Sequence, residues 1–194
     1  MRLTEEESER NRKQILEVAG RLFRQRGFDG VSVDDLMKAA GFTHGGFYNH
    51  FASKEELVAE ASAAGTAQAK AALVESLSEP RRDAWERFVR SYLSTEHRGD
   101  PAGGCTLGAL VADAARKRPA VQARFAEAVD EMVSALADHL AHKPSRGNRA
   151  RAHRERALQM LSELVGALVL ARAVAAADPA LSDEVLAANR RGLR

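Results

Sequence analysis

Apolar residues recur at helical intervals along most of the chain, and residues that cap or end helices separate one repeat from the next. The first repeat begins near Thr4 and ends at Arg26, before Gly27. A second begins at Ser32 and stops at Gly41, because glycine accepts the left-handed backbone that often follows a helix. This periodicity predicts an all-α protein.

A shorter helix is expected directly after that glycine. Thr43 is a candidate cap for it, and Phe47 and Phe51 lie four residues apart as apolar anchors. Ser53 and Glu56 then have the spacing of a capping box that opens a long helix. A helix, a turn with glycine and a second helix predict a helix-turn-helix motif.

The polar side of the short helix suggests what the motif contacts. If its two phenylalanines point inward, the open side carries Thr43, His44, Gly45, Tyr48 and Asn49, with His50 at the edge. Such groups hydrogen-bond phosphates and base edges well. The alternative is an ordinary solvated helix face. A glycine inside a helix costs about 1 kcal/mol relative to alanine, so the glycines at 45 and 46 argue against that alternative.

The block GFDGVSVDDLMKAAGFTHGGFYNHFASKEELVAEA resembles the DNA-binding region of TetR-family transcriptional regulators. The residues that fit the family pattern are Gly41, Phe42, Gly45, Tyr48, Phe51, Ser53, Lys54, Glu55 and Leu57. His44 and Gly46 depart from it, since many members have Lys and Thr or Ser there.

The resemblance implies a three-helix DNA-binding head over residues 1–52 and a helical effector-binding and dimerisation body over residues 53–194, with residues 53–78 as the linking helix. The DNA contacts that it implies are Ser32, Thr43, His44, Gly45, Tyr48, Asn49, His50 and Lys54, of which Tyr48 and Lys54 are phosphate contacts. Basic residues at positions 10, 12 and 13 are further candidates for the DNA backbone, or else serve only as solubilising charges.

Helices in the body are expected from Trp85, from Cys105, from Val121 to Leu140, over residues 150–177 and from Leu181. The segment 97–104, rich in helix breakers, is expected to be a loop, and the segment 143–156 is expected to be a basic loop that leads into a helix. The expected lining of an effector cavity comprises Trp85, Phe88, Tyr92, Cys105, Leu107, Met132 and Met160. An apolar lining suits a small hydrophobic or amphipathic effector, whereas the alternative for each residue is a plain core position.

The helix over 150–177 is apolar nearly all round, which predicts burial on every side. In a chain of this size, a second copy can supply part of that burial, and the resemblance implies a homodimer built from the last two helices. The expected interface residues are Leu158, Leu161, Val165, Leu168, Arg172, Val185 and Leu186. A monomer with a central helix is the alternative.

Composition narrows the functional classes. The net charge of only +2 permits nucleic-acid binding without arguing for it, and the single cysteine fits a reducing compartment. A signal peptide pattern is not seen, and the most apolar run is shorter than a membrane span, so a cytoplasmic protein without a membrane partner is expected. We find no nucleophile-elbow, phosphate-loop or zinc-protease motif, so neither an enzyme nor a cofactor or metal site is expected.

The sequence therefore predicts a regulator, a repressor, that binds a palindromic operator on double-stranded DNA as a homodimer and is released by a small-molecule effector. Two alternatives stay open. Cys105 follows two glycines at an expected helix start, where the helix dipole favours thiolate, so the repressor could sense electrophiles or oxidants. A helical adaptor that binds only proteins would not bind DNA at all.

Overall fold

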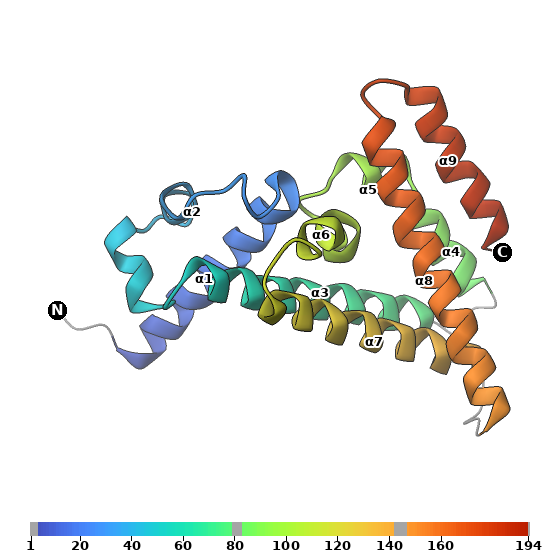
Figure 1. Ribbon diagram of the computed structural model, residues 1–194, viewed down its shortest axis with the longest axis horizontal. Coiled ribbons are helices and arrows are strands. Elements are labelled where there is room, and N and C mark those ends of the chain that lie inside the picture. The colour runs from blue at the N-terminus through green and yellow to red at the C-terminus, as the bar shows by residue number, and fades with distance from the viewer. Residues whose placement is uncertain (1–3, 79–82, 142–146, 194) are drawn as a thin grey trace.

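The computed structural model describes residues 4–78, 83–141 and 147–193, and within these ranges it is all-α, as predicted. The elements are α1 (Glu5–Arg26), α2 (Val33–Ala39), the 3-10 helix η1 (His44–Asn49), α3 (Lys54–Ser78), α4 (Ala84–Tyr92), α5 (Thr95–Gly99), α6 (Thr106–Ala114), α7 (Pro119–Ala141), α8 (Asn148–Val174) and α9 (Pro179–Gly192). Figure 1 shows α1, α2 and η1 at one end of an elongated molecule and the α8–α9 hairpin at the other.

The head forms because each of its helices has a local start and stop. Thr4 and Glu7 make a complete capping box on α1, and the Ser32 side chain accepts from the Asp35 N–H at the start of α2. Gly41 follows α2 with φ +82°, a conformation that favours glycine, and it turns the chain toward η1. Buried residues of α1, α2, η1 and α3, among them Ile15, Phe23 and Leu57, form the core beneath the motif.

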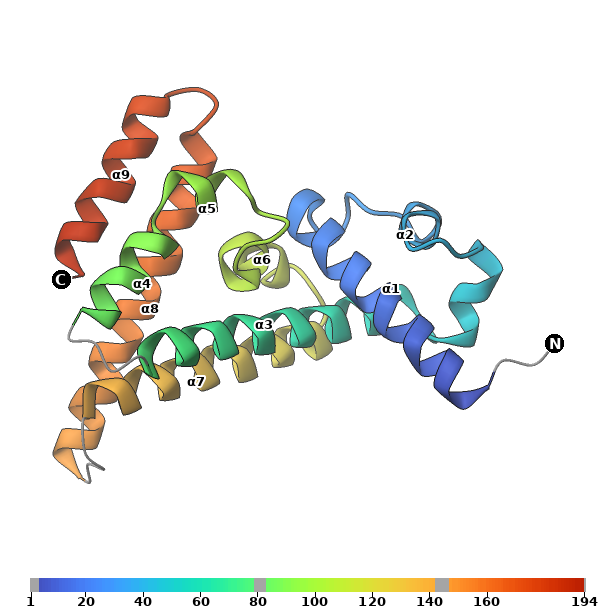
Figure 2. The same cartoon turned by 180° about the vertical axis from the view of Figure 1, so that it is seen from behind.

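The long helix α3 leaves the head and lies beside α7 in both views (Figures 1 and 2). Helix α7 packs in turn on α8, and α8 on α9. The short helix α6 contacts α1, α3, α7 and α8, so it stands where the head meets the body. A change in the position of α6 would therefore alter its contacts with α1.

Three expected boundaries are wrong. Residues 97–99, expected in a loop, belong to α5, whose start Ser94 caps by accepting from the His97 N–H. Helix α7 begins at Pro119, because proline lacks the N–H that a first helical turn leaves unused. Helix α8 already begins at Asn148, inside the expected basic loop, and residues 143–146 of that loop lie outside the described residues.

Helix α8 is long and apolar enough to cross a membrane by length and composition. Its buried residues, including Ala157, Leu164, Leu168 and Ala171, instead pack within the body. Only part of its apolar window is buried by the chain itself. The large apolar residues of α8 that the single chain leaves exposed are Leu158 and Leu170.

Candidate DNA-recognition surface and effector pocket

The short element η1 is held from behind by two aromatic rings. Phe47 and Phe51 are 1% and 2% exposed, and their rings stack with centroids 5.6 Å apart. Phe47 lies on η1 and Phe51 follows it, so the predicted inward anchors are confirmed as core residues. Their burial fixes which side of η1 faces outward.

The outward side carries the predicted polar residues. Thr43, His44, Gly45 and Asn49 are exposed, and Tyr48 is 65% exposed although it is a large aromatic residue. Nothing lies within 4 Å of the position that a Cβ on Gly45 would occupy, so the backbone there is open to a flat or grooved partner. His50 is half-buried, and its Nδ1 has no hydrogen-bond partner within the described residues.

Two expectations about this element are corrected. It is a 3-10 helix rather than an α-helix, and the Thr43 side chain makes no capping hydrogen bond. The Thr43 carbonyl instead accepts from the Gly46 N–H at 3.0 Å, which is the tighter turn of a 3-10 helix. The Thr43 hydroxyl is therefore not engaged in a cap.

Ser32 and Lys54 lie at the starts of the two helices that flank η1 in the chain. The exposed Ser32 hydroxyl bonds the Asp35 carboxylate at 2.6 Å, and the Ser32 bonds hold the pKa of that carboxyl below its usual range. Lys54 is the first residue of α3 and is half-buried. Ser53 accepts from the Glu56 N–H as expected, whereas the Glu56 carboxylate accepts from the N–H of Ala52 rather than that of Ser53.

Two residues of α1 hold the motif in place. The Arg12 guanidinium bonds Glu60 at 2.6 Å and lies 4.8 Å from the centroid of the Phe51 ring. The Gln14 side chain donates to the carbonyl of Ala40 at 2.9 Å, at the end of α2. The role of Arg12 here is to orient α1 against α3 and Phe51, and no periodicity in the sequence marks Gln14 as a cross-helix contact.

A cavity of about 560 Å³ lies in the body, bordered by α1, α3, α4, α7 and the segment before α6. Four of the seven expected lining residues are in its wall: Phe88, Tyr92, Cys105 and Met132. The other three are not. Leu107 and Met160 are buried core residues, and Trp85 stacks on Phe88 while its indole N–H donates to the Leu193 carbonyl at 2.5 Å.

The cavity wall is more polar than the sequence suggests. Arg24 reaches it from α1, and Arg87, Glu96 and His97 also line it. These residues were missed because helical periodicity identifies apolar faces, and a half-buried arginine between two such faces leaves no periodic signal.

His97 is held in one tautomer by two hydrogen bonds. Its Nδ1 lies 2.6 Å from the Tyr92 carbonyl, and its Nε2 lies 3.1 Å from the N of Cys105. A carbonyl only accepts and a backbone N–H only donates, so Nδ1 carries the proton and Nε2 accepts. Burial, opposed in part by the bond to Tyr92, lowers the pKa of His97 below its ordinary value of 6.5.

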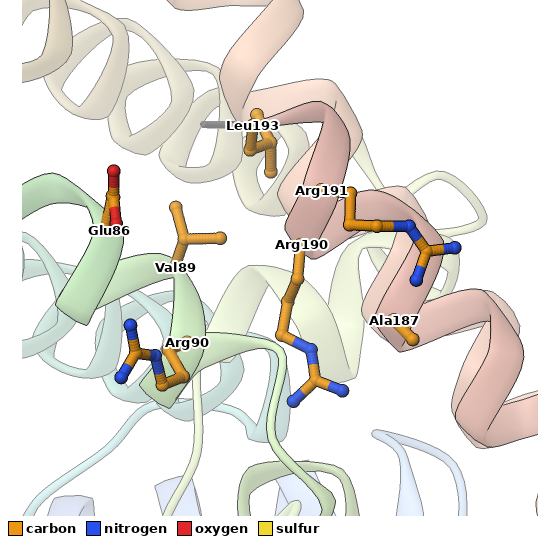
Figure 3. A pocket seen from close by; sticks show the side chains of 7 residues that line it. All are labelled: Glu86, Val89, Arg90, Ala187, Arg190, Arg191 and Leu193. Atoms are coloured by element: carbon orange, nitrogen blue, oxygen red, sulfur yellow. The ribbon is translucent and has the colours of Figure 1, made fainter.

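A smaller groove of about 340 Å³ lies between α4 and the end of α9 (Figure 3). Its wall comprises Glu86, Val89, Arg90, Ala187, Arg190, Arg191 and Leu193. None of the expected effector residues lies there.

The expected dimer residues divide into two sets. Leu161, Leu168 and Leu186 are 8%, 0% and 1% exposed, so the chain itself buries them and they are corrected to core residues. Arg172 is also used internally, since its guanidinium donates to the carbonyls of His97, Arg98 and Gly108. Leu158 is 41% exposed, and Val165 and Val185 are half-buried.

The family model for "Bacterial regulatory proteins, tetR family" matches residues 15–61, which span α1, α2, η1 and the start of α3. The chain is 44% identical over 59 residues to the HTH-type transcriptional regulator AcrR of Shigella flexneri, covering 30% of this chain and 27% of AcrR. It is 36% identical over 100 residues to the HTH-type transcriptional repressor AcnR of Corynebacterium glutamicum, covering 47% of this chain and 53% of AcnR. The chain thus matches between about a quarter and half of the length of these regulators.

The fold of the whole chain is also that of known structures. A TetR-family transcriptional regulator from Cytophaga hutchinsonii superposes with a TM-score of 0.75 over 100% of this chain and 96% of that one, at 22% identity. At this identity the likeness concerns the fold, including the body that the family model does not reach. Residues 15–61 thus form a domain that matches the TetR family of bacterial regulatory proteins, and the relatives and the solved structure to which the chain is similar are named as transcriptional regulators.

Proposed function

We propose that this protein is a transcriptional repressor that binds an inverted-repeat operator on double-stranded DNA as a homodimer and is released by a small hydrophobic or amphipathic effector. The observation that carries the proposal is the outward face of η1, where Tyr48 is 65% exposed directly above the buried rings of Phe47 and Phe51. A large aromatic side chain held in water on a rigid support is suited to contact a partner surface.

The chemistry of this face favours DNA as the partner. A phenolic hydroxyl, an asparagine amide and an imidazole are donors and acceptors for phosphates and base edges, and the open backbone at Gly45 permits close approach. Lys54 adds a positive charge at the first turn of α3, where backbone N–H groups also favour an anion. The DNA contacts proposed are the eight residues that the resemblance implies.

Exposed apolar residues near the C-terminus support a homodimer. Leu158 and Leu170 of α8 and Leu181 of α9 are 41%, 60% and 42% exposed. Because a two-fold pair presents the same patch twice, such a surface pairs with its own copy. A symmetric pair of heads then reads two inverted half-sites at a spacing that the body fixes.

The cavity and its connections to the head support release by an effector. Arg24 lies in the cavity wall and on α1, and its Nε donates to the Ala102 carbonyl at 2.8 Å. Lys117 after α6 bonds Asp29 of the head at 2.5 Å, and Phe28 packs edge-on against Phe125 of α7. A ligand that binds the cavity more tightly in one arrangement of α1 and α6 shifts the protein toward that arrangement and changes the spacing of the heads.

A second candidate trigger is covalent modification of Cys105. This thiol lies in the cavity wall beside Tyr92, so a small electrophile in the cavity would meet it. The test is to treat the protein–DNA complex with N-ethylmaleimide, which alkylates thiols, and to measure how much protein stays bound. The treatment should release the wild-type protein from DNA and leave the Cys105→Ser variant bound. Release of both, or of neither, would exclude the cysteine as the trigger.

The proposal as a whole is tested by selecting bound fragments from genomic DNA and screening compounds for their release. Recovery of fragments that share an inverted repeat is expected, together with footprints on one face of the duplex and a cytoplasmic location for the protein. Fragments without a shared repeat would contradict the proposal.

A further inference from the structure

Two arginines are half-buried at the junction of the helices, and they differ in how their charges are satisfied. The Arg172 guanidinium donates from all three nitrogens to carbonyls of the α5–α6 region. Among the residues that the structure describes, Arg24 makes one hydrogen bond, from Nε to the Ala102 carbonyl. Within the described ranges, no carboxylate lies within ion-pairing distance of Arg24, so its two terminal nitrogens are not accounted for.

The site around Arg24 has room for its guanidinium. A Cβ added to Gly20 of α1 would lie 3.4 Å from a terminal nitrogen of Arg24, and one added to Gly65 of α3 would lie 3.1 Å from the same atom. These two glycines therefore keep the helices open where the guanidinium passes between them. Burial lowers the pKa of Arg24 from its ordinary value, opposed in part by the negative charge of Asp100, and the group stays charged at neutral pH.

The rest of the cavity combines apolar surface with one acid, one further arginine and several neutral polar groups. Ala69, Ala72, Phe88 and Met132 supply apolar surface, and the half-buried Tyr92 contributes a hydroxyl with no hydrogen-bond partner within the described residues. The carboxylate of Glu96 is engaged locally, since hydrogen bonds from its own backbone N–H and from the hydroxyls of Ser94 and Thr95 lower its pKa. The charged and polar lining further comprises Arg87, His97, Gln68, Ser76, Ser91 and Ser94.

We propose that the effector is an amphipathic carboxylic acid whose carboxylate pairs with Arg24, while its apolar part contacts the α3–α4 side of the cavity. This inference rests on the proposed effector binding and adds the chemical class of the effector. A guanidinium presents two parallel N–H groups to a carboxylate, and such charge-assisted bonds are roughly twice as strong as neutral ones. A neutral polar group on the same apolar tail would leave the Arg24 charge unpaired, and a cationic group would repel it.

The test compares three probes that share an eight-carbon tail and differ in the charge of the polar group: octanoate, 1-octanol and octylammonium. Each is titrated by calorimetry against the full-length protein. We expect octanoate to bind about tenfold or more tightly than octanol, and octylammonium to bind most weakly, since one such bond corresponds to at least a factor of ten. Arg24→Gln should remove the preference for octanoate, and Arg24→Lys should restore part of it.

The control is Arg21→Gln, which removes an exposed charge from the same helix but not from the cavity wall and should keep the full preference. Thermal unfolding of each variant shows whether it folds. Equal binding of octanoate and octanol, a preference that survives Arg24→Gln, or no binding by any probe would overturn the inference. Because these titrations contain no DNA, their failure is distinct from a failure of operator binding.

Discussion

The rings of Phe47 and Phe51 stack 5.6 Å apart, with 30° between their planes, directly behind the face that carries Tyr48. The Tyr48 ring packs edge-on against Phe47 with centroids 5.3 Å apart. The exposed Tyr48 side chain is therefore supported by the buried side chain of Phe47. The stability of the head and its contact with a partner are therefore expected to depend on different residues: Phe47 and Phe51 for stability, and Tyr48 for the contact.

Phe47→Ala should destabilise the protein by about 3–5 kcal/mol, because it leaves a cavity in the core of the head. Tyr48→Ala should change the free energy of unfolding by much less, since that ring is mostly exposed. Urea unfolding followed by circular dichroism measures both. Similar losses in the two variants would contradict the division between support and contact surface.

Arg172→Leu should destabilise the body by about 2–4 kcal/mol, because three carbonyls lose a charged donor. Arg172→Lys should restore little, since one ammonium cannot reproduce the planar guanidinium. The matched control is Arg149→Leu, an exposed position on the same helix, which should unfold like the wild type. An unaltered midpoint of urea unfolding for Arg172→Leu would show that these hydrogen bonds contribute nothing to the stability of the body.

Acidification should destabilise the protein through His97. Its folded-state pKa lies below the ordinary 6.5, so the unfolded chain takes up the proton first as the pH falls. The stability from neutral His97 is complete above pH 6.5, decreases below it and is lost once the pH passes the folded-state pKa. Protonation also places a proton on Nε2, facing the N–H of Cys105.

The measurement is the change in unfolding free energy between pH 7.5 and pH 5.5. His97→Gln should show a smaller change than the wild type, whatever its absolute stability. His44→Gln, at an exposed position, should keep the wild-type change. A wild-type pH dependence in His97→Gln would rule His97 out as the source.

Leu170→Glu should convert the proposed dimer to monomers, because it places a charge in the most exposed apolar patch of α8. Sedimentation velocity should show the smaller species, and affinity for an inverted repeat should fall more than affinity for a single half-site. Val74→Glu on α3, also exposed, is the control and should stay dimeric. A dimeric Leu170→Glu would place the interface elsewhere.

Much of the head could be predicted from local sequence signals. Thr4 and Ser32 cap helices, and Gly41 follows one, through contacts and backbone geometry that involve only neighbouring residues. The helix ends at these positions therefore follow from the sequence alone. The inward direction of Phe47 and Phe51 follows from their spacing. The 3-10 geometry of η1 did not follow, because its tighter turn at Thr43 and Gly46 has no distinct residue signature.

The body was harder to predict, since its decisive contacts join distant parts of the chain. The resemblance implies an interface role for Arg172, yet its guanidinium donates to carbonyls more than sixty residues away in its own chain. Arg24 was missed for the same reason: only the packing of α1 against α3 and α6 brings it to the cavity. Periodicity separates apolar from polar faces but does not reveal which polar group is buried.

The most direct test of the central claim is the affinity for a selected inverted-repeat duplex, measured by fluorescence anisotropy over a range of salt concentrations. We expect wild-type affinity to fall steeply with salt, and Tyr48→Ala and Lys54→Ala to weaken binding, with a shallower salt slope for Lys54→Ala. Val74→Glu should bind like the wild type, because Val74 is an exposed residue near the C-terminal end of α3, whereas Lys54 is the first residue of that helix. Unchanged affinity in both Tyr48→Ala and Lys54→Ala, or wild-type binding that is independent of salt, would contradict recognition of DNA by the η1 face.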